Sequence, residues 1–262
     1  MDRIYWQKQT KDSPLFPDLL WSRPETRLHA GKLLIIGGNG YEFKAPANAY
    51  GDALEAGIGT AKVLLPDSMK KTVEDIFPEA EFATSTHSGS FARAALEQLL
   101  SLAEWADGVL LAGDLGHNSE TAIVLESFLT KYDRQLTIAG DAIDYCLSMA
   151  PICLERPDTT LILTSAQLQK LGTAAHYTAA FTSDMALLQL VEQLHDFSSQ
   201  YPANLLVQHD GSIVVAVQGR ICSTNDPQTV NLTAVAAHGS VWWLQNSSKP
   251  YEALTTSLLE QP

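Results

Sequence analysis

The chain has 262 residues, 45% hydrophobic and 18% charged, so it can bury the core of one α/β domain. Its formal net charge of −13 argues against nucleic-acid binding, which depends on clustered Lys and Arg. No apolar run reaches the roughly 20 residues needed to cross a bilayer, and residues 1–8 lack a signal-peptide core, so we expect a cytoplasmic protein without a membrane partner.

Metal and disulfide sites are not predicted. The three cysteines, Cys146, Cys153 and Cys222, form no CxxC motif, and we expect them to be buried structural thiols. The seven histidines never lie three or four residues apart, so no helical pair of metal ligands exists.

Apolar runs typical of strands recur after a Pro-rich segment that ends at Pro24. The predicted strands are Leu33–Ile36, Ala61–Leu65, Gly108–Ala112, Leu136–Ala139, Thr160–Leu163, Leu205–Val207 and Ile213–Val217. Amphipathic patterns between them predict helices at Ala45–Glu55, Ser68–Ile76, Phe91–Ala103, Glu120–Lys131, Asp141–Met149, Ala166–Leu171, Met185–Phe197 and Tyr251–Leu259.

This alternation predicts a doubly wound, mostly parallel central sheet with helices on both faces. The short link between the last two predicted strands, residues 208–212, resembles a hairpin and favours an antiparallel edge. We expect one domain over residues 1–262, with residues 1–26 as an N-terminal extension packed on it.

The segment 33–49 is the first candidate site, because a buried strand runs into a glycine turn and then into an alanine-rich helix. Helix-start amides after such a turn can face a phosphate-bearing ligand. A dinucleotide fingerprint would use Gly38 and Gly40, but Phe43 occupies the position of the third glycine. No GxxxxGK[ST] motif occurs either.

A second strand-to-helix turn lies at residues 111–121, where Gly113, Gly116 and Asn118 would suit a pyrophosphate. Either Asn118 or Ser119 would suit the cap of the helix that follows. An ordinary turn is the alternative. Asp114 would repel phosphate unless it holds a cation or points away.

Asp141 follows another strand and could act as a general base, as a ligand of Mg²⁺-bound water, or only as a helix cap. There is no GxSxG elbow, and no serine is tied by spacing to a His and an acid, so a hydrolase triad is not predicted. The carboxyl ends of parallel strands should gather these groups at one edge, with Thr164–Ser165 and His238–Ser240.

The order of elements resembles the ADP-dependent NAD(P)H-hydrate dehydratases. Residues 31–39 with Tyr41 and residues 44–46 resemble the opening GK-strand-GGS…Y-x-GAP pattern of that family, and His29 fits its lead-in. Residues 111–121 resemble its IGPGLG segment, Asp141 matches the second Asp of its DAD motif, and residues 163–166 lie where the family has LTPH. Residues 248–254 are similar to its final P-F-E-A-A helix, so the resemblance spans roughly residues 27–259.

The resemblance implies a ribokinase-like fold, ADP or ATP with Mg²⁺ as cofactor, and a hydrated NADH or NADPH as substrate. Catalytic candidates are Asp141 or Asp114 as base, with His238 or His209 contacting phosphate. The expected position at the carboxyl edge of the sheet and the resemblance together predict a set of residues that contact substrate or nucleotide. These are Gly38, Asn39, Tyr41, Ala45, Gly113, Gly116, Asn118, Thr164, Gln208, Gly239 and Ser240.

Four motif positions depart from the family pattern. Ala139 replaces the first Asp of DAD, Ala166 the His of LTPH and Gln208 a Lys, while residues 236–241 lack the Asp of G-[ST]-G-D. These departures favour a non-catalytic nucleotide-binding or structural homologue, a pseudoenzyme, over a dehydratase with residual lyase activity. A sugar or vitamin kinase of the same superfold is the third interpretation.

Family analogy alone suggests a homo-oligomer. We expect Trp242 and Trp243 to lie in the core or in an oligomer contact rather than to stack on a base.

Overall fold

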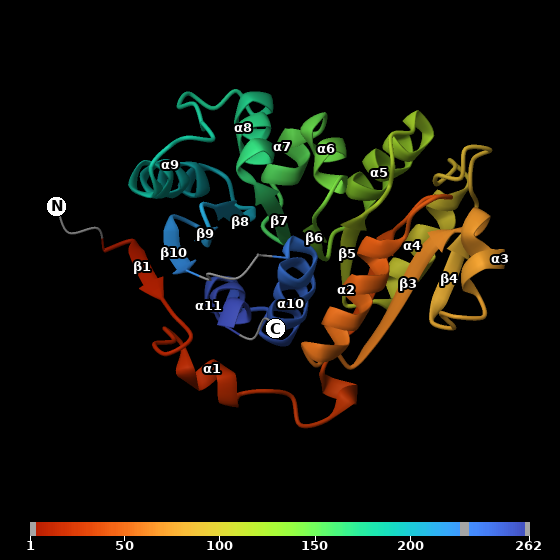
Figure 1. Ribbon diagram of the computed structural model, residues 1–262, viewed down its shortest axis with the longest axis horizontal. Helices are drawn as coiled ribbons and strands as arrows, with labels where there is room; N and C mark the ends of the chain where they lie inside the picture. Colours follow the sequence, from red (N-terminus) through yellow and green to blue (C-terminus); the bar gives the residue numbers. More distant parts are fainter. Residues whose placement is uncertain (1–3, 226–230, 260–262) are drawn as a thin grey trace.

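The computed structural model describes residues 4–225 and 231–259, and these residues form one ten-stranded sheet with helices on both faces (Figure 1). The strand order is β1-β10-β9-β8-β7-β6-β5-β2-β3-β4. The strands are β1 (Trp6–Gln9), β2 (Lys32–Gly37), β3 (Thr60–Pro66), β4 (Ala80–Ala83), β5 (Gly108–Gly113), β6 (Gln135–Ile138), β7 (Thr159–Thr164), β8 (Asn204–His209), β9 (Ser212–Val217) and β10 (Arg220–Asn225).

Strand β9 is antiparallel to both β8 and β10, and every other pairing in the sheet is parallel. This confirms the predicted mostly parallel, doubly wound sheet and the hairpin between its last two predicted strands. Beyond the hairpin the sheet continues through β10 to β1, two strands that the apolar pattern did not predict.

The two faces of the sheet carry separate sets of helices. One face is covered by α4 (Ala95–Trp105), α5 (Ser119–Lys131), α6 (Ala142–Leu147), α7 (Ala150–Leu154), α8 (Ser165–Ala174) and α9 (Leu187–Gln200). The other is covered by α1 (Pro17–Trp21), α2 (Lys44–Glu55), α3 (Lys70–Val73), α10 (Leu232–Gln245) and α11 (Pro250–Thr256). Short 3₁₀ turns lie at Arg27–His29, Asp67–Met69 and Ser257–Leu259.

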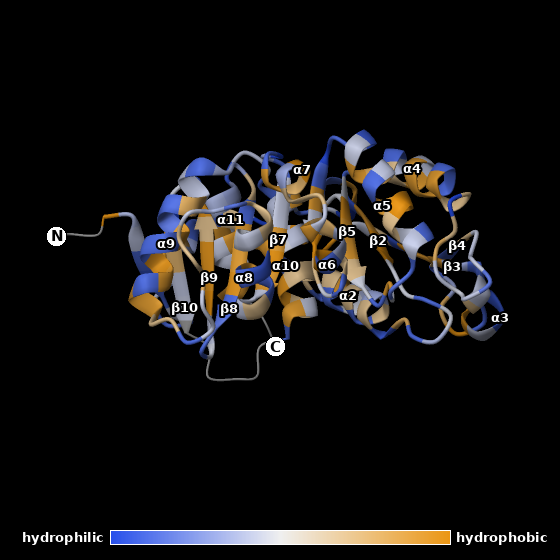
Figure 2. Ribbon diagram, turned by 90° about the horizontal axis from the view of Figure 1, so that it is seen from above, coloured by the Kyte–Doolittle hydropathy of each residue, from blue (hydrophilic) through white to orange (hydrophobic). Residues whose placement is uncertain are grey.

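The strand sequences account for these two layers. Side chains alternate across a strand, so Leu34 and Ile36 of β2 enter one core while Leu33 and Ile35 enter the other. Because both faces are covered, the strands read as continuous apolar runs, which Figure 2 shows as bands within a more polar shell. Cys146, Cys153 and Cys222 are buried free thiols, as predicted.

Helix α10 is the main element that the sequence did not predict, because no helix was expected over Leu232–Gln245. Its sequence is apolar on nearly all sides, and ten consecutive residues, Ala234–Trp243, are buried between α2, α11 and the sheet (Figure 1). A helix buried all round has no polar stripe and hence no 3.6-residue pattern to detect. Trp242 and Trp243 belong to this core, which confirms one of the two predicted alternatives.

Among the described residues, no helix combines the length and apolar character needed to cross a membrane.

Candidate functional site

The candidate site lies where the parallel strands end at their carboxyl edge, because loops after β2, β5, β6, β7 and β8 meet there. The predicted contact residues from Gly38 to Gln208 lie on these loops or at the strand and helix ends beside them.

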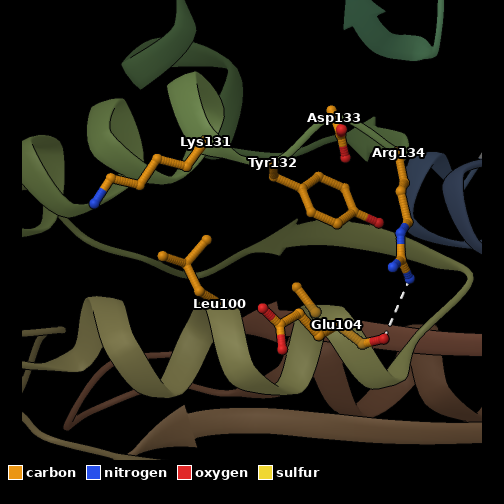
Figure 3. A pocket seen from close by; sticks show the side chains of 7 residues that line it. Leu100, Glu104, Lys131, Tyr132, Asp133 and Arg134 are labelled. Carbon is orange, nitrogen blue, oxygen red and sulfur yellow. Dashed lines mark hydrogen bonds between the residues drawn. The ribbon is translucent and has the colours of Figure 1, made fainter.

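A cavity of about 320 Å³ lies at the opposite edge, between the last turns of α4 and α5 (Figure 3). Arg134 lines this cavity, but its guanidinium group is not free to bind a ligand. Its Nη1 already donates to the carbonyls of Glu104 (3.2 Å) and Ala106 (2.9 Å). Arg134 thus satisfies backbone acceptors at the end of α4. The cavity also contains Leu100, Ala103, Lys131, Tyr132 and Asp133, none of them a predicted site residue.

At the carboxyl edge, β2 and β5 end in close contact. Gly38 N donates to Gly113 O at 3.0 Å. A Cβ built on Gly37 would lie 2.4 Å from Gly113 O, so this approach requires glycine. The glycine turn predicted from the sequence therefore serves first to join two strand ends.

Asn39 links the loops that follow these strands. Its Nδ2 donates to Asp114 O at 2.7 Å, and its Oδ1 accepts from Tyr41 N at 2.9 Å. Tyr41 is 91% exposed at the tip of the first loop. Its ring is therefore accessible to a ligand at this edge.

Asp114 occupies the amino end of α2. Its Oδ2 accepts from Ala45 N at 2.6 Å, and its backbone holds a left-handed φ of 57°. Pro46 follows Ala45 and has no N–H to offer. The helix-start amides that the sequence suggested for a phosphate thus face a carboxylate of the protein itself, which repels a second anion.

Asp141 plays a similar part for the loop after β5. Its carboxylate accepts from Leu115 N (3.2 Å) and Gly116 N (2.9 Å), although it stands at the N-cap of α6 and makes no capping bond there. Burial raises the pKa of Asp141, and the two amide bonds act in the opposite direction. Gly116 has a φ of +69°, a conformation that glycine adopts without strain.

Two further side chains fix this loop. Tyr145 donates to Gly116 O and accepts from Asn118 N at 3.2 Å. Asn118 Oδ1 caps α5 by accepting from Glu120 N (2.8 Å) and Thr121 N (3.3 Å), so the cap is the first of the two predicted residues. Asn118 Nδ2 donates to Ser88 Oγ at 3.0 Å, which ties the loop at 85–90 to the site.

These contacts give the β2–β5 half of the edge a definite chemistry. The amides of Ala45, Leu115 and Gly116 donate to carboxylates of the chain, so they do not form a pyrophosphate cradle. Two carboxylates and an exposed aromatic ring instead suit a ligand that donates hydrogen bonds and stacks. The described residues contain no group of three or more His, Cys, Asp or Glu side chains able to hold a metal ion.

In the β7–β8 half of the edge, no carboxylate of the described residues is bonded to the helix start. Thr164 caps α8 through a capping box with Gln167, whose Nε2 also donates to Gly140 O at 2.9 Å. Gln208 ends this half beside Thr164, its direct partner in the β7–β8 register. The first turn of α8 can therefore take an anion without competition from a bound carboxylate.

Ser165 was predicted to lie at this edge without a chemical role, and His209 was predicted only as an alternative phosphate contact. Ser165 Oγ donates to Gln208 O at 2.8 Å and lies 3.4 Å from His209 Nδ1. The ring's other nitrogen, Nε2, lies 3.5 Å from Asp210 Oδ2. These residues are 45 positions apart at most, and only the pairing of β7 with β8 brings them together. Knowing that β7 and β8 are neighbours would have identified this group, whereas the spacing of the three residues in the sequence does not.

His238, Gly239 and Ser240 are not at this edge, which corrects their predicted location. They lie in the middle of α10, and His238 is 1% exposed. Gly239 packs towards Leu254, and Ser240 Oγ donates to Ala236 O within the helix at 2.7 Å. Residues 226–230, which precede the Asn231 cap of α10, lie outside the described part of the chain.

The structure thus brings the predicted residues together in two groups and leaves one group apart. The β2–β5 group comprises Gly38, Asn39, Tyr41, Ala45, Gly113, Asp114, Gly116, Asn118 and Asp141. Thr164 and Gln208 form the β7–β8 group.

Comparisons with known proteins agree with this architecture. No family model matches the chain. A stretch of 92 residues is 34% identical to the bifunctional NAD(P)H-hydrate repair enzyme Nnr of Methanothermobacter thermautotrophicus, covering 35% of this chain and 18% of that enzyme.

Solved structures match over nearly the whole chain. A ribokinase-like superfamily protein from Enterococcus faecalis V583 superposes with a TM-score of 0.70 at 15% identity, covering 99% of this chain and 87% of that one. The ADP/ATP-dependent NAD(P)H-hydrate dehydratase of Bacillus subtilis, co-crystallised with ATP and Mg²⁺, gives 0.63 at 11% identity, covering 94% and 86%. The chain has the ribokinase-like fold, as the resemblance implied, and a hydrate dehydratase is among its structural neighbours.

Proposed function

We propose that this chain binds an adenine nucleotide at the β7–β8 half of the carboxyl edge and a hydrated nicotinamide nucleotide at the β2–β5 half. The observation that carries the proposal is the division of the edge. One half has its helix-start and loop amides bound to Asp114 and Asp141, whereas the first turn of α8 is capped only by the neutral Thr164 and Gln167. Phosphates favour the second half.

The likeness to a hydrate dehydratase that was crystallised with ATP and Mg²⁺ supports the same ligands. Mg²⁺ would accompany the nucleotide as its counter-ion, since it is usually held by substrate phosphates and one or two carboxylates. Asp210, exposed beside this half, would supply such a carboxylate.

Turnover is a separate part of the proposal. Asp141 and Asp114 are acidic groups of the β2–β5 half, and both already accept backbone hydrogen bonds. Ala139, Ala166 and Gln208 offer no charge where the resemblance expects Asp, His and Lys. Loss of a single preorganised hydrogen-bond donor typically lowers kcat by about 10²–10³. We therefore expect the chain to bind both ligands but to dehydrate hydrated NADH far more slowly than an enzyme that has all these groups.

Thermal unfolding with ADP, ATP, NADH and hydrated NADH tests the binding. A ligand at 100 times its dissociation constant adds about 2.7 kcal/mol to the free energy of unfolding. Gln208→Glu, which places a carboxylate beside α8, should weaken ADP binding at least tenfold, while Gln169→Glu on the exposed side of α8 should not. The absence of any saturable shift with ADP or ATP in the native chain would refute the nucleotide site.

The second ligand is tested with Asp141→Asn. This variant keeps one acceptor oxygen and replaces the other with an NH₂ donor, so one of the bonds from Leu115 N and Gly116 N is lost. It should therefore bind hydrated NADH more weakly, without a change in ADP affinity. An absorbance assay for regenerated NADH measures turnover directly. Rapid ADP-dependent regeneration would overturn the expectation of slow catalysis and leave the binding sites in place.

A further inference from the structure

Ser165, His209 and Asp210 form a line of polar groups at the carboxyl ends of β7 and β8. Ser165 Oγ lies 3.4 Å from His209 Nδ1, and His209 Nε2 lies 3.5 Å from Asp210 Oδ2. The imidazole therefore has a hydroxyl on one side and a carboxylate on the other. A nucleophile, a base and a group that orients the base have this arrangement.

The position of Ser165 suits a nucleophile. It is the first residue of α8 and follows the last residue of β7 directly, so it stands on a strand-to-helix turn. Its hydroxyl is half-buried and donates to Gln208 O at 2.8 Å. Rotation about the Cβ–Oγ bond re-aims that proton at His209 Nδ1 without moving a heavy atom.

The position of His209 suits a base. The ring is 3% exposed, and Nε2 has no hydrogen-bond partner that meets distance and angle criteria among the described residues. A proton on Nε2 facing Asp210 leaves the lone pair of Nδ1 towards Ser165, which is the tautomer that a base requires. The Asp210 side chain is 86% exposed, so Oδ2 can move the few tenths of an ångström that a full hydrogen bond needs.

The first turn of α8 supplies a donor for negative charge. Ala166 follows Ser165 there, and the first amides of a helix have no partner within the helix. In strand-to-helix nucleophile turns, the amide after the nucleophile is one of the two donors to the oxyanion.

We propose that Ser165 is a nucleophile towards small activated acyl esters, with His209 as its base and Asp210 as the residue that orients His209. Ser165 Oγ attacks the carbonyl carbon while its proton moves to His209 Nδ1. The ester C–O bond then breaks, and the leaving alkoxide takes that proton. Water repeats the sequence in reverse, releasing the carboxylic acid and restoring the Ser165 hydroxyl. No redox partner or metal takes part.

This activity goes beyond the proposed nucleotide binding, and its test does not depend on it. A fluorophosphonate probe reacts with an activated serine, forming a Ser Oγ–P bond as the P–F bond breaks and fluoride leaves. We expect the native chain to be labelled at Ser165, identified by mass spectrometry of the tryptic peptide, without any nucleotide present.

Variants assign the roles. Ser165→Ala should abolish labelling, and His209→Gln should slow it by 10²–10⁴, the range for loss of a general base. Asp210→Asn should slow it less, because Asp210 is exposed and its charge is screened. Ser148→Ala, an exposed serine on α6's end, is the matched control and should label as the native chain does. Labelling that is equal in native chain and Ser165→Ala would overturn the proposal.

A second measurement separates activation from folding defects. In Ser165→Cys, a neighbouring imidazolium should lower the pKa of the new thiol below the ordinary value of about 8.5. Alkylation by iodoacetamide across pH 5–10 reads this pKa directly, and His209→Gln in the same background should raise it back. If Ser165→Cys has the same melting temperature as the native chain but an unshifted thiol pKa, the role of His209 is refuted.

Discussion

At the scale of single residues, His238 shows how a group that looks reactive in sequence can be structural. It lies in α10 with neither ring nitrogen hydrogen-bonded within the described part of the chain. Burial lowers its pKa below 6.5, and the nearby charges, Glu55 of α2 and Arg23 before β2, act in opposite directions. The neutral ring is therefore the form that the folded protein accommodates.

This gives a pH dependence with a definite sign. The unfolded chain binds a proton at His238 near pH 6.5, whereas the folded chain does so only at lower pH, so stability is lost as the pH falls below about 6.5. Urea unfolding from pH 5 to 8 should show a slope that His238→Leu reduces, by at most about 1.4 kcal/mol per pH unit. His87→Gln, at an exposed loop histidine, should leave the slope unchanged. Equal slopes in the native chain and His238→Leu would contradict this account.

At the scale of elements, Asn118 belongs both to a helix and to the candidate site. Its Oδ1 caps α5 and its Nδ2 reaches Ser88 across the edge. Loss of such a cap usually costs about 1 kcal/mol, within a range of 0.5–2.

The two bonds can be separated by substitution. Asn118→Ala removes both, and we expect a loss of about 1–2 kcal/mol in the free energy of unfolding in urea. Asn118→Asp keeps the capping oxygens and places a negative charge at the start of α5, so it should retain most of the native stability. A loss as large in Asn118→Asp as in Asn118→Ala would show that the contact with Ser88, not the cap, is what matters.

The elements also show what sequence could and could not predict. The runs around Leu34 and Leu110 were identified because parallel strands covered on both faces are apolar throughout. Strands β1, β4 and β10 were missed, since Trp6–Gln9, Ala80–Ala83 and Arg220–Asn225 are mixed in polarity. Strand β1 in addition pairs with β10, which lies far away in the sequence. The edge was predicted from strand order, but which amide donates to which carboxylate depends on three-dimensional contacts such as Asp114 with Ala45.

At the scale of the whole molecule, residues from both ends of the chain meet in one layer. Gln9 of β1 is 2% exposed, and its Nε2 donates to Thr224 Oγ1 (3.0 Å) in β10 and Thr255 O (2.5 Å) in α11. Figure 1 shows that the segment after β1, which contains α1, runs past the outer side of α11 and α10 before the chain enters β2. One side chain thus joins the first strand, a late strand and the last helix.

Replacing that side chain should weaken the whole fold. Gln9→Leu removes two buried donors and leaves their acceptors unpaired, so we expect a loss of about 1–3 kcal/mol in the free energy of unfolding. Lys8→Ala, on the exposed side of the same strand, is the control and should change it by less than 0.5 kcal/mol. Urea titration followed by tryptophan fluorescence measures both, and indistinguishable midpoints would mean that β1 is dispensable.

The pairing of β1 with β10 also bears on how the protein is made. Trp6 Nε1 donates to Ser223 Oγ across 217 positions of sequence. A ribosome that adds 5–20 residues per second needs on the order of 10–40 s to cover that distance. During this time β1 has no neighbour to pair with, while β2 can already pair with β3 and β5. Strand β1 is therefore synthesised long before it can be placed in the sheet, and its exposed edge must be shielded until β10 emerges.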